Sequence, residues 1–173
     1  MNNRILVTYA TKYGATAEIA VKIGNVLRES GFQTNVVPIE QVEEVYMYRA
    51  VIMGSAIYMG QWRKEAVQFL KNKKELLGER PTWIFSSGPT GEGNPDDLLN
   101  GWHYPEKLND VMDVIQPQNI TVFHGGLNLN KLNMLEKWIV RNVNAEAGDF
   151  RDWDTIVTWA TQIACELKNP EFA

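Results

Sequence analysis

The stretch ILVTYATKYGATAEIAVKI, residues 5–23, decides the fold, and its first residues (5–7) form the short apolar run typical of a strand buried on both faces. A hydroxyl-rich loop with one glycine, residues 8–16, follows this run. The apolar pattern resumes at Ile19 and Ile23 with the spacing of an amphipathic helix. Strand, loop and helix in this order direct the free N–H groups of the first helical turn into the loop, where an anion can bind. The stretch therefore predicts a phosphate-binding loop.

The composition of this loop narrows the type of phosphate ligand. No lysine–hydroxyl pair follows Gly14 as in a P-loop, and the three glycines of a dinucleotide fingerprint are missing. A receiver domain would have carboxylates after the first strand, and none occur there. Thr11 and Thr16 can donate hydroxyl hydrogen bonds, and Lys12 either adds charge or points to solvent. The loop suits the single terminal phosphate of flavin mononucleotide (FMN), with a merely structural turn as the alternative.

Composition predicts a soluble, cytoplasmic protein. The 173 residues are 45% hydrophobic and 22% charged, and a net charge of −4 offers no basic field to nucleic acid. The single cysteine, Cys165, excludes an internal disulfide, favours a reducing compartment and is expected to be packed. No signal-peptide pattern or apolar run of membrane-spanning length occurs. His103 and His124 lack clustered acidic or cysteine partners, so we predict no metal site.

Apolar strands alternate with amphipathic helices along the chain. Beyond the first strand and helix, strands are predicted at residues 34–39, 50–55, 81–87 and 119–126, and helices at 63–77, 105–115, 131–143 and 152–168. This alternation is typical of a parallel sheet covered on both faces, and five such units are too few for an eight-stranded barrel. We predict one α/β domain over residues 1–173, a flavodoxin-like doubly wound sheet of five parallel strands in the order 2-1-3-4-5.

The remainder of the binding site is expected in the loops beyond the carboxyl ends of these strands. Loop 55–62 would place Tyr58 against a flavin ring, with Gly60 allowing close backbone approach or a positive φ, whereas Trp62 is expected to pack in the core. Loop 87–94 would line the pyrimidine edge of the ring, or its glycines form ordinary turns. The predicted cofactor-binding residues are Thr11, Lys12, Tyr13, Gly14, Ala15, Thr16, Ala56, Ile57, Tyr58, Met59, Gly60, Ser87, Gly88, Pro89, Thr90 and Gly91.

The segment from Val7 to Ile23 resembles the signature of the flavodoxin-domain family, although Thr8 stands where an apolar residue is usual. The residues in register are Tyr9, Thr11, Gly14, Thr16, Ala20 and Ile23. Three further stretches, at residues 54–62, 123–127 and 148–160, resemble the branch that includes the menaquinone-dependent protoporphyrinogen dehydrogenases. The resemblance covers nearly the whole chain and implies a flavoprotein with FMN as cofactor.

An insertion at residues 127–147 separates the fifth strand from the last helix. The resemblance implies a counterpart in the porphyrinogen dehydrogenases, which is notably basic there. Here the insertion carries three cations, Lys131, Lys137 and Arg141, against two acids, Glu136 and Glu146. Its apolar residues either face a partner subunit, in which case the protein is an oligomer, or cover the sheet edge.

These features together predict an FMN-binding flavodoxin-like oxidoreductase or electron-transfer protein, and the resemblance implies a relation to protoporphyrinogen oxidation. The chemistry would occur at flavin N5 without a protein nucleophile, and His124 is a candidate for proton delivery. The expected partner is a redox protein, a quinone or a small-molecule substrate, with no nucleic acid and no membrane span. The alternative is a flavin-free module of the same fold that serves binding or regulation.

Overall fold

The central sheet has the strand order predicted from the sequence. The computed structural model describes residues 3–142 and 146–169. Its parallel strands, in spatial order, are β2 (Gln33–Pro38), β1 (Arg4–Ala10), β3 (Ala50–Tyr58), β5 (Thr82–Ser87) and β6 (Asn119–Phe123). Numbered among themselves, these strands follow the order 2-1-3-4-5, so the flavodoxin-like α/β fold is confirmed.

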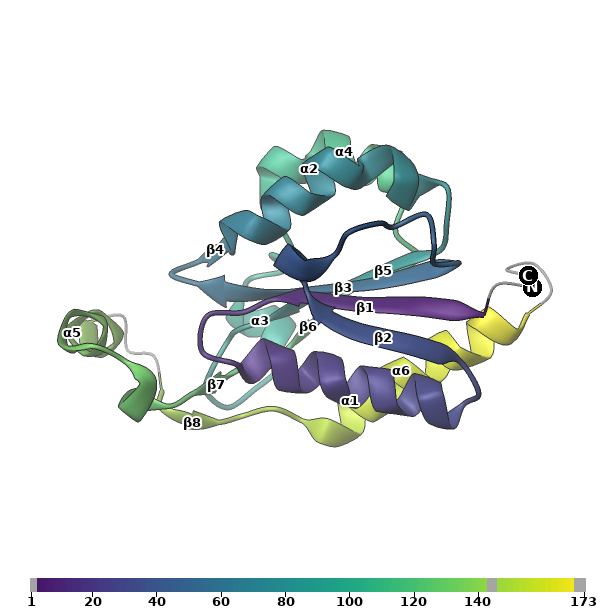
Figure 1. Ribbon diagram of the computed structural model, residues 1–173. Coiled ribbons are helices and arrows are strands. Elements are labelled where there is room, and N and C mark those ends of the chain that lie inside the picture. Colours follow the sequence, from purple (N-terminus) through teal and green to yellow (C-terminus); the bar gives the residue numbers. More distant parts are fainter. Residues whose placement is uncertain (1–2, 143–145, 170–173) are drawn as a thin grey trace.

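Helices cover both faces of this sheet (Figure 1). On one face α1 (Ala15–Glu29) packs beside α6 (Trp153–Lys168), and on the other α2 (Lys64–Gly78) packs beside α4 (Asn109–Ile115). Successive side chains of a strand point to opposite faces. Ile5 and Val7 therefore enter the core under α1 and α6, whereas Leu6 enters the core under α2 and α4. The apolar run of β1 is buried on both faces, as predicted.

Polar residues within this framework are satisfied locally. Thr8 is fully buried in β1, and its hydroxyl donates to the carbonyl of Val37 on β2 at 3.0 Å, which explains how a polar residue is tolerated there. Asp152 caps α6 by accepting hydrogen bonds from the N–H groups of Asp154 and Thr155. Cys165 is exposed on α6, so the expectation that it would be packed was wrong.

Residues 55–62, which the sequence predicted to be a loop, form a hairpin made of the end of β3 and a short following strand. β3 continues to Tyr58 and pairs with the antiparallel strand β4 (Gln61–Trp62). The turn residues Met59 and Gly60 have φ angles of 51° and 70°, the left-handed conformation that a tight two-residue hairpin turn requires. The positive φ predicted for Gly60 is confirmed. Trp62 is buried, as expected, and its indole N–H donates to Ser86 at 2.7 Å.

Several short elements lie at or near the carboxyl-terminal edge of the sheet. They are α3 (Pro95–Leu98), the 3₁₀ turn Leu129–Lys131, α5 (Met134–Asn142), and the strand pair β7 (Gly126–Leu127) and β8 (Gly148–Asp149). Further 3₁₀ turns span Ile39–Gln41 and Glu106–Leu108, and the second precedes α4 where a continuous helix was predicted from residue 105. α5 stands apart from both helical layers (Figure 1). Among residues 3–142 and 146–169, no helix has the length and apolar character needed to cross a membrane.

Candidate cofactor-binding site

A cavity of about 680 Å³ lies beyond the carboxyl ends of β1, β3 and β5. This volume falls within the usual range of small-molecule sites. The predicted site residues that line it are Thr11, Lys12, Tyr13, Ala15, Thr16, Ala56, Ile57, Tyr58, Met59, Gly60, Ser87, Gly88, Pro89 and Thr90. Gly14 and Gly91 are not among its lining residues. The structure thus brings the three predicted loops together around one cavity.

The loop between β1 and α1 presents hydrogen-bond donors at this cavity. Gly14 is the N-cap of α1 with φ 98°, a conformation that favours glycine. Its N–H donates to the hydroxyl oxygen of Thr11 at 3.0 Å, which leaves the hydroxyl proton of Thr11 available to another acceptor. The first bond of α1 runs from the N–H of Glu18 to the carbonyl of Gly14. The N–H groups of residues 15–17 precede that bond and have no acceptor within the helix, as at any helix start.

Lys12 lies among two tyrosines and a carboxylate. Its Nζ is 2.6 Å from Oε1 of Glu136 and 3.6 Å from the ring centroid of Tyr58. The rings of Tyr13 and Tyr58 meet edge to face with their centroids 6.0 Å apart. The ammonium therefore covers one face of Tyr58 in a cation–π contact and ties it to α5. This pairing with Glu136 was not foreseen, since the sequence suggested that Lys12 either attracts phosphate or points to solvent.

The cluster holds its members in their ordinary charge states near neutral pH. The hydrogen bond from Lys12 lowers the pKa of Glu136 to about 2. Burial acts to lower the pKa of Lys12, but its interactions with Glu136 and the two tyrosines raise it above the ordinary value. For Tyr13 the effect of burial has the opposite sign: it raises the pKa of the phenol. The result is a carboxylate, an ammonium and a neutral phenol at the edge of the cavity.

Two walls of the cavity were missed by the sequence reasoning. Leu98 and Leu99 enter from the region of α3, and Ile139 and Val140 enter from α5. α5 begins as a capping box does: the carboxylate of Glu136 accepts from the N–H of Asn133, and the side chain of Asn133 accepts from the N–H of Glu136. The Asn-x-x-Glu spacing was a readable signal for this helix start, but its position over the cavity was not.

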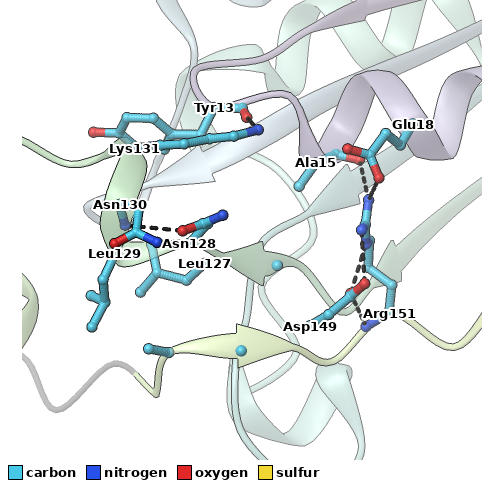
Figure 2. Close-up of a pocket in the computed structure, with 13 residues that line it drawn as sticks. Tyr13, Ala15, Glu18, Leu127, Asn128, Leu129, Asn130, Lys131, Asp149 and Arg151 are labelled. Atoms are coloured by element: carbon cyan, nitrogen blue, oxygen red, sulfur yellow. Dashed lines mark hydrogen bonds and ion pairs between the residues drawn. The ribbon is translucent and has the colours of Figure 1, made fainter.

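A second cavity of about 590 Å³ adjoins the first on the side of α1 (Figure 2). Both are lined by Tyr13, Ala15, Gly126 and Leu127. The charged residues that line this second cavity are Glu18, Lys131, Asp149 and Arg151.

His124, the candidate for proton delivery, is not a lining residue of the first cavity. Its Nδ1 lies 3.1 Å from the carbonyl oxygen of Pro89, and its Nε2 lies 2.9 Å from that of Gly93. The imidazole thus joins the end of β6 to the loop after β5.

Similar solved structures define the fold. A flavodoxin from the domain Archaea superposes with a TM-score of 0.61 and 14% identity, covering 96% of this chain and 99% of that chain. The rubredoxin oxygen:oxidoreductase of Desulfovibrio gigas gives a TM-score of 0.63 at 14% identity. The match covers 96% of this chain but only 36% of that longer chain. These likenesses establish a flavodoxin fold.

The sequence comparisons establish the family. This chain belongs to the Flavodoxin domain family, whose sequence model matches residues 6–154. A curated relative, Protoporphyrinogen IX dehydrogenase (quinone) of Escherichia coli strain K12, is 21% identical over 172 residues. That alignment covers 93% of this chain and 94% of the relative. The resemblance identified from the motifs is confirmed.

Proposed function

We propose that this protein binds FMN in the cavity of about 680 Å³ and acts as a flavin-dependent oxidoreductase or electron carrier. One observation carries the proposal. In a chain of the Flavodoxin domain family, the loop at the start of α1, with the free N–H groups of a helix start, borders a mostly apolar cavity that Tyr13 and Tyr58 line. FMN has the complementary shape and charge, because a phosphate dianion lies at one end and a flat, largely apolar ring at the other.

The residues at the phosphate end fit this group. The first turn of α1 offers backbone N–H groups and the positive end of the helix dipole. Thr11 keeps a hydroxyl proton to donate, because its oxygen already accepts from Gly14. Thr16 is buried and lines the cavity, which places a second hydroxyl at the same end.

The residues at the ring end fit as well. Tyr58 and Met59 supply aromatic and thioether contacts for a ring face. Ser87 and Thr90 line the cavity where the polar pyrimidine edge is predicted, and the turn at Gly60 would bring a peptide group close to the ring. Ile139 and Val140 of α5 close the apolar wall, which excludes water from the bound ring.

The bound flavin would supply electron or hydride transfer at N5, and the chain's residues would bind it, orient it and tune its potential. The likeness to protoporphyrinogen IX dehydrogenase supports a porphyrinogen substrate with a quinone as acceptor. The likeness to flavodoxins supports a redox partner protein instead. The same proposal places the protein in the cytoplasm, because the single cysteine, Cys165, suits a reducing compartment.

An absorption spectrum of the purified protein tests the proposal. We expect flavin absorption bands and release of FMN on denaturation. Thr16→Glu places a carboxylate at the phosphate end and should abolish FMN binding by charge repulsion. Thr161→Glu, on the exposed side of α6, is the matched control and should bind FMN normally. A wild-type protein that neither contains nor takes up FMN would contradict the proposal and favour the flavin-free module.

A second experiment separates an enzyme from a carrier. Reoxidation of the reduced flavin by a quinone is followed with and without protoporphyrinogen. Turnover of the porphyrinogen supports an oxidoreductase acting on that substrate. Exchange of electrons with a redox protein, without porphyrinogen turnover, supports an electron carrier.

A further inference from the structure

Lys131 reaches from the segment between β7 and α5 to the phosphate-binding loop, 118 positions earlier in the chain. Its Nζ donates to the carbonyl of Tyr13 at 2.8 Å (Figure 2). The same Nζ lies 3.6 Å from the point where a Cβ on Gly14 would be. Since Gly14 is the N-cap of α1, the ammonium lies close to the start of that helix, where the first N–H groups have no acceptor within the helix.

Of the two cations that line the second cavity, Lys131 is the one without a carboxylate partner among the described residues. Arg151 is committed to Glu18 at 2.8 Å, to Asp149 at 2.7 Å and to the carbonyl of Ala15 at 3.2 Å (Figure 2). Its hydrogen bonds lower the pKa of Asp149. The charge of Glu18, in the first turn of α1, is thereby partly compensated, since Arg151 is shared between Glu18 and Asp149, and Glu18 repels an anion less than an unpaired carboxylate would. Lys131 forms no ion pair with a carboxylate in the described parts of the chain.

Lys12 does not take this role in the structure. Its ammonium is paired with Glu136 and lies over the ring of Tyr58, at the ring end of the first cavity. An ammonium group has three N–H donors, and the carbonyl of Tyr13 uses one donor of Lys131. Two donors of Lys131 remain for a ligand.

We propose that Lys131 is the cationic phosphate-binding residue of this protein, and that it makes the site select phosphorylated flavin over riboflavin. The inference rests on the proposed binding of FMN and deepens it. A charge-assisted hydrogen bond to the phosphate dianion stabilises bound FMN, whereas riboflavin has no phosphate to receive it. The contact also fastens the segment before α5 to the cofactor.

The test measures dissociation constants of the flavin-free protein for FMN and for riboflavin, by quenching of flavin fluorescence at low ionic strength. The variants are Lys131→Met, Lys131→Arg, and the control Lys137→Met. Lys137 is also in the inserted segment, and it lines neither of the two cavities that reach the loop. Far-UV circular dichroism shows whether each variant is folded.

We expect Lys131→Met to weaken FMN binding roughly tenfold while leaving riboflavin binding unchanged. Lys131→Arg and Lys137→Met should retain the preference for FMN. An equal loss of affinity for both flavins would overturn the inference, because Lys131 would then only hold the loop through Tyr13. Unchanged FMN affinity in Lys131→Met would overturn it as well. If the wild-type protein binds no FMN, the proposed function fails first, and the inference fails with it.

Discussion

Replacing Gly88 with alanine tests how tightly the wall of the candidate site is packed. Gly88 directly follows β5, and its N–H donates to the carbonyl of Phe123 at 3.2 Å. An added Cβ would lie 2.4 Å from the Cβ of Ile57 and 3.2 Å from its Cα. Carbon atoms in contact are normally about 3.5–4.0 Å apart, so the two segments must separate by about 1 Å. A rotamer change of Ile57 cannot relieve the clash, because its Cβ is fixed to the backbone.

The opposite side of Gly88 is also closely approached, since a Cβ on Gly125 would lie 3.1 Å from the Cα of Gly88. Retreat of the loop is therefore hindered. We expect the free energy of unfolding to fall by about 2 kcal/mol and Tm by about 4–8 °C, as for other overpacked sites in domains of this size. The same movement displaces the predicted pyrimidine edge, so Kd for FMN should rise by roughly tenfold or more, which corresponds to about 1.4 kcal/mol.

Urea unfolding followed by circular dichroism gives the stability, and fluorescence titration gives Kd. Gly126→Ala is the steric control for stability, because an added Cβ there lies 3.4 Å from Oδ1 of Asp149 and 3.6 Å from Nε of Arg151. Gly126 also has no positive φ. This control should stay within about 0.5 kcal/mol of the wild-type stability. Wild-type stability and FMN affinity in Gly88→Ala would refute the tight apposition of the loop and β3.

Three further substitutions or conditions test other parts of the structure. Gly54→Ala would place a Cβ 2.1 Å from the enclosed ring of Phe85, and urea unfolding should show a loss of about 3 kcal/mol, whereas a loss below about 0.5 kcal/mol would contradict this packing. Asp152→Ala removes the N-cap of α6, and thermal unfolding should show a loss of about 1 kcal/mol. Lys12 lowers the pKa of Glu136 from 4.5 to about 2, so the stabilisation from this ion pair is present above pH 4.5 and is lost as the pH falls through 2. An NMR titration of the carboxylate measures this, and a midpoint near 4.5 would show that the pair does not form in solution.

The features that local patterns control were predictable from the sequence. The apolar run of residues 5–7, the loop with Gly14 and the helical spacing after it each depend on neighbours a few positions away. Five apolar strands alternating with helices leave few topologies for a parallel sheet, because crossovers are right-handed and both faces must be covered. The strand order and the meeting of three loops at one edge follow from these rules.

Two local features were not recognised from the sequence. The hairpin of β3 and β4 turns through Met59, which has a positive φ without the Asn-Gly or Asp-Gly pair that usually marks such a turn. α3 begins at Asn94-Pro95, where Asn94 accepts from the N–H of Asp96 and Pro95 is the first helical residue. The sequence reasoning assigned this Asn-Pro pair to the glycine-rich loop after the fourth predicted strand, because glycines surround the pair.

The position of α5 could not be predicted from local patterns, because Lys12 and Glu136 are 124 positions apart. The sequence reasoning considered two roles for its apolar residues: to face a partner subunit or to cover the sheet edge. In the structure Ile139 and Val140 face the cavity, while Met134, Leu135 and Trp138 are 88%, 66% and 63% exposed. A helix of nine residues is too short to be stable in isolation. Its place therefore depends on tertiary contacts, which include the ion pair from Glu136 to Lys12 and the side chains of Ile139 and Val140 at the cavity.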